Sequence, residues 1–136
     1  DRSRFSMDWY YPILGGIKSK KRIASLTAKI KDSFWIQDLG IKCVSDEPWV
    51  TVAETSECSI AYKKIGEDKI ALELLHNAIA IVDGNGIPYM CWQFSESIYW
   101  PDETPAWTSA ACILAADANN RLTSGADLFL KQQFQS

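Results

Sequence analysis

The chain has 136 residues, enough for one domain with a substantial hydrophobic core and too few for two. Its content of 47% hydrophobic and 23% charged residues excludes a disordered chain. A net charge of -3 provides no electrostatic attraction for nucleic acid, and no apolar run approaches the roughly 18 residues of a membrane span. We therefore expect neither a nucleic-acid partner nor a membrane span.

The N-terminal segment 5–16, FSMDWYYPILGG, combines one acid with three consecutive aromatic residues. Aromatic side chains form cores, but they also line sites for sugars and apolar ligands. On a helix Trp9, Tyr10 and Tyr11 would lie about 100° apart, so only one or two of them can face one site. Asp8 has two interpretations: it caps the helix that begins at Trp9, or it faces a pocket.

Hydrophobic periodicity and turn residues predict further helices along the chain. Gly66 ends one helix, and the turn sequence DGNG at 83–86 ends the next, before an aromatic segment that is extended or irregular. Helices arranged as antiparallel hairpins are expected over residues 17–34, 51–65, 67–82 and 104–118, with a short last helix over 125–134.

Two stretches echo each other, one beginning at Pro48 and one at Pro105. Each places proline, tryptophan and a Thr or Ser at the mouth of a helix made mainly of small residues. Such an echo is either a chance match or the mark of a helical-hairpin repeat. A repeat would place the small-residue helices in an inner layer and helices such as 67–82 in an outer one, as in a solenoid or a closed α/α toroid.

The four cysteines, Cys43, Cys58, Cys91 and Cys112, form no Cys-x-x-Cys motif. The one histidine, His76, belongs to the polar stripe of a predicted helix. We therefore expect no metal site and no cofactor. Since the chain shows no signal peptide, reduced structural thiols and a cytoplasmic location are expected.

Four motifs in order, MDWYYPILGG, CVSDEPWVTVAETSE, DGNG and ETPAWTSAACILAADA, resemble the C-terminal part of bacterial prenyltransferase-like proteins. These proteins belong to the α/α toroid superfamily, with terpene cyclases and protein prenyltransferases. The resemblance covers nearly the whole chain and implies an all-α fold, in which antiparallel helical hairpins form part of an α/α toroid with an aromatic-lined centre. It also implies that residues 1–136 are a single domain and a fragment of a longer toroid. It carries over no zinc ligands and no catalytic acid motif.

Two glutamates in the predicted helix 51–65, Glu54 and Glu57, lie one turn apart among small and apolar residues. At least one carboxylate is expected to face a cavity, where burial would raise its pKa and suit it to general acid catalysis. The alternative is a structural acceptor for a helix terminus or a tryptophan N–H. The candidate catalytic residues are Glu54 and Asp8. The candidate ligand-binding residues are aromatic or acidic: Trp9, Tyr10, Trp49, Glu57, Trp92, Trp100 and Trp107.

The leading functional hypothesis is a prenyltransferase-like toroid that binds an isoprenoid or another mainly apolar ligand in its aromatic centre; whether it is an enzyme stays open. The alternatives are a carbohydrate-active toroid that uses inward carboxylates and a non-catalytic interaction module. Because an incomplete toroid would expose apolar surface, a homodimer that buries the segment 5–16 between chains is also expected.

Overall fold

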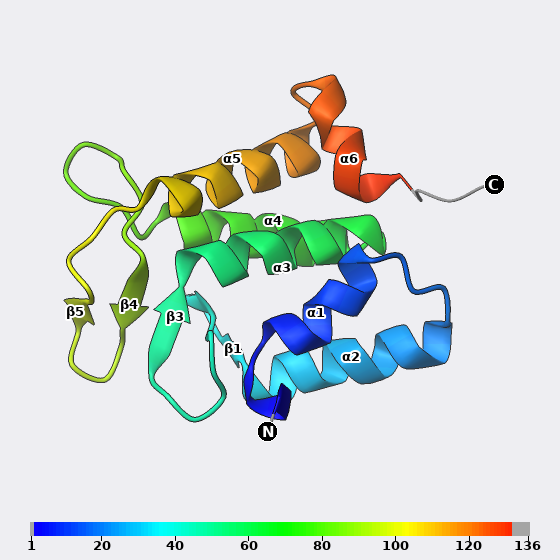
Figure 1. Ribbon diagram of the computed structural model, residues 1–136, viewed down its shortest axis with the longest axis horizontal. Helices are drawn as coiled ribbons and strands as arrows, with labels where there is room; N and C mark the ends of the chain where they lie inside the picture. Colours follow the sequence, from blue (N-terminus) through cyan, green and yellow to red (C-terminus); the bar gives the residue numbers. More distant parts are fainter. Residues whose placement is uncertain (1, 132–136) are drawn as a thin grey trace.

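The computed structural model describes residues 2–131, which form a layered helical body with strands at one end (Figure 1). In the view of Figure 1, α5 lies above α3 and α4, and the pair α1 and α2 lies below them. The helices are α1 (Met7–Leu14), α2 (Lys20–Ser33), α3 (Val52–Lys64), α4 (Asp68–Ile79), α5 (Ala106–Asn120) and α6 (Asp127–Leu130). Two 3-10 turns, Arg2–Arg4 and Ser124–Ala126, precede α1 and α6. None of the described helices is long and apolar enough to cross a membrane.

The strands show that the all-α prediction is wrong. They are β1 (Trp35–Ile36), β2 (Gly40–Ile41), β3 (Trp49–Thr51), β4 (Cys91–Gln93) and β5 (Ile98–Tyr99). Across the described residues they form an antiparallel hairpin of β1 and β2 and an antiparallel sheet in the order β3-β4-β5. Strands of two or three residues are too short to give a period-2 pattern, so the sequence did not predict them as a sheet.

The helix α3 lies at the centre, where it packs against α1, α4 and α5. Nine of its 13 residues are buried, and they surround the whole helix instead of forming one stripe. Most of these residues are small, so the neighbouring helices can approach closely. On α5 the buried residues are likewise small, and they include Ala111, Ala115 and Ala118.

The predicted helices occur with shifted ends, but they do not form a toroid of hairpin repeats. The segment 17–34 contains α2, and 67–82 contains α4. The first residue of the predicted helix 51–65 belongs to β3 instead, because Thr51 pairs with Cys91 across the sheet. Of the predicted last helix, α6 is the part that the structure shows, and residues 132–134 lie outside the described residues.

The β1–β2 hairpin is anchored on the first turn of α3 by one threonine. The Thr55 hydroxyl accepts a hydrogen bond from the Ile41 amide at 2.9 Å and donates one to the Thr51 carbonyl at 2.6 Å. Gly40 has a φ of 126°, and a Cβ there would lie 2.7 Å from Thr55 Oγ1. Only glycine fits this close, left-handed position, which places the hairpin directly against α3.

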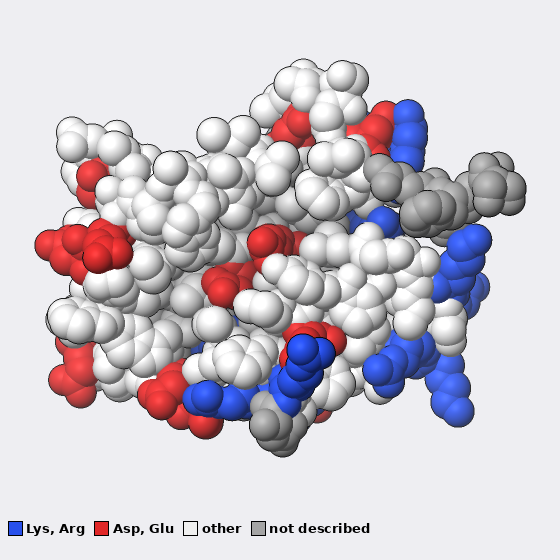
Figure 2. All heavy atoms as spheres, viewed as in Figure 1, with Lys and Arg blue, Asp and Glu red and all other residues white. Residues whose placement is uncertain are grey.

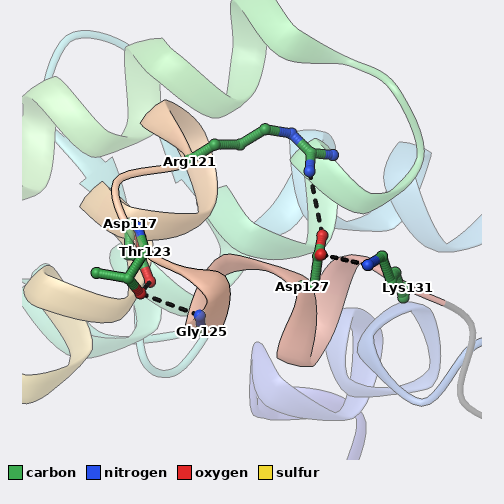
Figure 3. A network of polar contacts seen from close by, with 6 residues as sticks. All are labelled: Asp117, Arg121, Thr123, Gly125, Asp127 and Lys131. Carbon is green, nitrogen blue, oxygen red and sulfur yellow. Dashed lines mark hydrogen bonds and ion pairs between the residues drawn. The ribbon is translucent and has the colours of Figure 1, made fainter.

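A polar network fixes the turn between α5 and α6 (Figure 3). The two Asp117 carboxyl oxygens accept hydrogen bonds from the amide and the hydroxyl of Thr123, both at 2.7 Å. Farther along, Asp127 pairs with Arg121, at 3.1 Å, and with Lys131. Arg121 ends α5 in the left-handed conformation, so the chain reverses there and α6 folds back toward α3.

Candidate functional site

Glu54 and Glu57 lie one turn apart on α3, and both are half-buried. Figure 2 shows acidic atoms over the first half of α3, in the middle of this face and surrounded by uncharged side chains. Carboxylates normally prefer the solvated edge of a protein. We refer to Glu54, Glu57 and the side chains that contact them as the carboxylate site.

Two consecutive tyrosines of α1 reach this site. The Tyr10 hydroxyl donates a hydrogen bond to Glu57 Oε2 at 2.6 Å, and the Tyr10 side chain is fully buried. Tyr11 packs edge-to-face against Tyr10, with ring centroids 5.1 Å apart, and also reaches the Glu57 carboxyl. Because Tyr11 is 47% exposed, it forms the solvent side of the site.

Glu57 is harder to ionise than an exposed glutamate. Burial is the main cause of its raised pKa, the Tyr10 hydrogen bond lowers the pKa in part, and the negative charge of Glu54 raises it again. A carboxyl group with a raised pKa keeps its proton closer to neutral pH. The pKa of Glu57 is therefore shifted in the direction that a general acid requires.

Glu54 is bordered by two thiols. Burial and the neighbouring Glu54 carboxylate raise the pKa of Cys43 to about 12. Burial is also the main cause that raises the pKa of Cys91 to about 11. Both thiols are therefore neutral near pH 7. Glu54 Oε2 is buried and has no hydrogen-bond partner among the described residues, a state that calls for a donor from water or a ligand.

The two tryptophans of the three-stranded sheet lie on opposite faces. Trp49 and Cys91 share one face, because Thr51 pairs with Cys91 and side chains alternate along a strand. Trp92 lies on the other face, opposite Val50, and packs with it in a separate hydrophobic cluster. Trp49 therefore lies on the same side of the sheet as the Cys91 thiol near Glu54, whereas Trp92 is partly buried on the other side.

The remaining predicted site residues do not converge on Glu54 and Glu57. Asp8 is exposed on α1 and does not cap it, because α1 begins at Met7. The Trp9 indole donates to the Ser3 carbonyl at 3.0 Å, and its ring lies under Lys29 of α2. Trp100 and Trp107 are more than half exposed, one after β5 and one in the first turn of α5.

Sequence reasoning missed three members of the site: Tyr11, Cys43 and Cys91. Tyr11 was recognised only as a member of the aromatic cluster, and the cysteines only as structural thiols. No sequence pattern relates Cys43 or Cys91 to Glu54. Cys91 lies on β4, which pairs with β3, and Cys43 lies between two residues that form isolated bridges, Lys42 with Val50 and Val44 with Phe5. Among residues 2–131, no group of three or more His, Cys, Asp or Glu side chains lies close enough together to hold a metal ion.

A groove of about 1150 Å³ lies elsewhere on the molecule. It lies between α2 on one side and the end of α3 with the start of α4 on the other, and the end of α1 contributes Ile13. Neither Glu54 nor Glu57 is among its described lining residues. The two features are therefore separate.

Comparison with known proteins identifies one informative relative. The chain is 39% identical over 129 residues to the MMP endo-(1,4)-3-O-methyl-α-D-mannosidase of Mycolicibacterium hassiacum. That protein is a mannosidase. The alignment covers 94% of the chain and 36% of the relative, so the chain spans about a third of the relative's length. No family model matches the chain.

This relative and the two sheets correct the resemblance to prenyltransferase-like proteins, and with it the leading hypothesis of an isoprenoid-binding toroid. Two of the four motifs behind that resemblance place a proline and a tryptophan before a small-residue helix. In the structure they describe the strand-to-helix junction at β3 and α3 and the start of α5, which close helix packing explains without a shared function.

Proposed function

We propose that the chain carries part of the active site of a carbohydrate-active enzyme that hydrolyses α-linked mannosides. Glu57 on α3 carries this proposal, since glycoside hydrolysis uses a carboxyl group with a raised pKa as its acid. The similarity to an endo-acting mannosidase supports the choice of sugar. The ligand is then sugar-like, which agrees with the tyrosines that border the pair.

Glu57 is the proton donor in this mechanism. Hydrolysis breaks the bond between the anomeric carbon and the glycosidic oxygen. The leaving oxygen takes a proton, and water supplies the hydroxyl group that becomes bonded to the anomeric carbon. The raised pKa of Glu57 lets it hold that proton, and the Tyr10 hydrogen bond fixes its carboxyl group. Glu54 acts as a positioning residue, because its negative charge favours the protonated form of Glu57.

The carboxylate that activates water comes from a segment other than α3. Glu54 and Glu57 are one turn apart, so their Cβ atoms lie about 5–6 Å from each other on the same side of a helix. Glycoside hydrolysis requires carboxyl groups that flank the bond from both sides. Glu54 and Glu57, on one face of α3, can approach the sugar from one side only. The second catalytic carboxylate must therefore face α3 from the other side of the ligand.

Hydrolysis of an oligosaccharide of α-(1,4)-linked 3-O-methylmannose, measured as the release of reducing ends, tests the proposal. Glu57→Gln should lower kcat roughly 10²- to 10⁴-fold, the usual contribution of a general acid. Glu54→Gln should shift the alkaline limb of the pH profile to lower pH, because it lowers the pKa of Glu57.

Glu47→Gln is the matched control, since Glu47 is exposed in the turn before β3. It should leave both kcat and the pH profile unchanged. Full activity of Glu57→Gln would reject Glu57 as the acid. If the wild-type protein binds the oligosaccharide without cleaving it, the non-catalytic interaction module is the better description.

A further inference from the structure

The walls of the groove between α2 and α4 have an unusual composition. On α2, the lining residues recur at the spacing of a single helix face, and they are Lys20, Ile23, Ala24, Thr27, Ala28 and Lys31. The neighbouring face of α2 carries Leu26 and Ile30, which are fully buried. The groove-lining face of α2 is therefore distinct from its core-facing side. It is apolar in its centre and has a lysine at each end.

The facing wall is also apolar. It is formed by Tyr62 and Ile65 at the end of α3 and by Ile70 on α4, with Ile13 and Trp35 between the walls. Along α2, the lined stretch from Lys20 to Lys31 is about 16 Å long at 1.5 Å per residue. The groove therefore has the shape and the lining for an extended apolar chain.

Charge distinguishes one end of the groove from the other. Lys18, Lys20 and Lys64 line the end where α2 begins, and Glu67 is the acidic lining residue at the start of α4. Lys64 donates to the Leu14 carbonyl at 2.7 Å, and burial lowers its pKa, so a nearby anion would stabilise its charge. Figure 2 shows Lys and Arg gathered at this end of the molecule. The lining also includes Lys31 and Glu73, and Glu73 accepts a hydrogen bond from Gln37.

We propose that this groove binds a single-chain anionic amphiphile: an unbranched alkyl chain lying between α2 and α4, with a carboxylate head at Lys18, Lys20 and Lys64. The excess of lysine over glutamate at one end provides the charge complementarity, and the alanines of α2 provide room for the chain. A sugar fits less well, because the centre of the groove has few hydrogen-bonding side chains. The inference is independent of the proposed hydrolysis.

Titration calorimetry with dodecanoate, below the concentration at which it forms micelles, tests the site. Dodecanoate should bind with one-to-one stoichiometry, and added salt should weaken the binding. Dodecyltrimethylammonium has the same chain with the opposite charge, and dodecyl maltoside has an uncharged sugar head; both should bind more weakly. Equal binding of all three would overturn the assignment of the head group, and tighter binding of the maltoside would show that the groove selects a sugar.

Two variants locate the binding site. Ala28→Leu fills the centre of the groove and should abolish dodecanoate binding, while leucine remains a good helix former. Lys18→Gln combined with Lys20→Gln should raise the Kd roughly 3- to 10-fold, as expected for two exposed ion pairs.

The matched controls are Ser25→Leu and Lys21→Gln, which make the same kinds of change on α2 outside the lining of the groove. They should bind dodecanoate like the wild type, and circular dichroism should show that every variant is folded. Wild-type affinity in a folded Ala28→Leu variant, or absence of dodecanoate binding to the wild type, would overturn the proposal.

Discussion

Glu57 is subject to opposing influences at the scale of a single residue. The Tyr10 hydroxyl stabilises its ionised form, whereas burial and the Glu54 charge favour its protonated form, and the raised pKa shows that the second effect is larger. A site with this balance costs stability when it ionises. Such a cost is common where a carboxyl group is retained for chemistry.

Replacement of Glu57 by glutamine should therefore change the pH dependence of stability. Because the folded-state pKa is raised, the stabilising contribution of protonated Glu57 is full below its unfolded pKa of about 4.3 and is lost as the pH rises through the folded pKa. Relative to Glu57→Gln, the wild type should become less stable as the pH rises above about 4.3. Urea unfolding across this range measures the difference, and parallel curves for the two proteins would contradict it.

Gly40 shows how one backbone position holds an element in place. In Gly40→Ala the new Cβ would lie 2.7 Å and 2.9 Å from Thr55 side-chain atoms, at a φ of 126°. We expect a loss of roughly 2 to 5 kcal/mol of unfolding free energy, from strain and overpacking together. Thermal unfolding should show Gly84→Ala close to the wild type, since a Cβ at Gly84 meets nothing within 4 Å.

At the scale of elements, amphipathic patterns predicted the positions of α2 and α4, and small-residue composition predicted α3 and α5. The β-strands could not be predicted, because each has only two or three residues and β3 depends on a partner distant in sequence, as Val50 depends on Trp92. The same distinction applies to the site. Glu54, Glu57 and Tyr10 were identified from local sequence, whereas the places of Cys43 and Cys91 near Glu54 depend on tertiary structure.

Thr55 should anchor the β1–β2 hairpin through its hydroxyl group. Thr55→Val keeps the shape of the side chain but leaves the buried Ile41 amide without an acceptor, at a cost of roughly 1–3 kcal/mol. Thr55→Ser keeps the hydroxyl group and should lose only about 1 kcal/mol for the missing methyl group. Urea unfolding compares them, and a valine variant as stable as the serine variant would show that the hydroxyl group does not anchor the hairpin.

Asp117 should hold the α5–α6 turn more strongly than Asp127 does (Figure 3). Asp117→Ala removes the acceptor of the Thr123 amide and hydroxyl, so amide exchange over residues 124–131 should accelerate several-fold. Asp127→Ala removes only ion pairs with the exposed side chains of Arg121 and Lys131 and should change the exchange little. The reverse order in hydrogen-exchange measurements would contradict the argument.

At the scale of the whole molecule, the expected homodimer through residues 5–16 stays a prediction, but its contacts need revision. Tyr10 and Ile13 are buried within the chain, so their replacement would damage the core instead of an interface. The exposed aromatic residues of the segment are Phe5 and Tyr11. The solvent face of α5 exposes apolar side chains as well, among them Ile113 at 67%.

Light scattering at micromolar concentration can tell these surfaces apart. If the segment 5–16 forms the dimer, replacing Phe5 and Tyr11 with serine should yield monomers, because both side chains are exposed and can be changed without a cavity. Ile113→Ser is the control on α5 and should leave the dimer intact. Monomeric wild-type protein would reject the dimer, and dissociation by Ile113→Ser alone would move the interface to α5.

The central place of α3 has a consequence for synthesis on the ribosome. Its partner α4 follows almost at once, so this hairpin can close early, whereas α5 emerges only after the strands β4 and β5. Until α5 has been synthesised, the side of α3 that α5 will cover remains exposed to solvent. That side carries Ser56 and Ser59, whose hydroxyl groups later contact Cys112 and Asn119. Before α5 packs against α3, both hydroxyl groups can form hydrogen bonds with water. The nascent chain should therefore aggregate less readily than one that exposes an all-aliphatic helix.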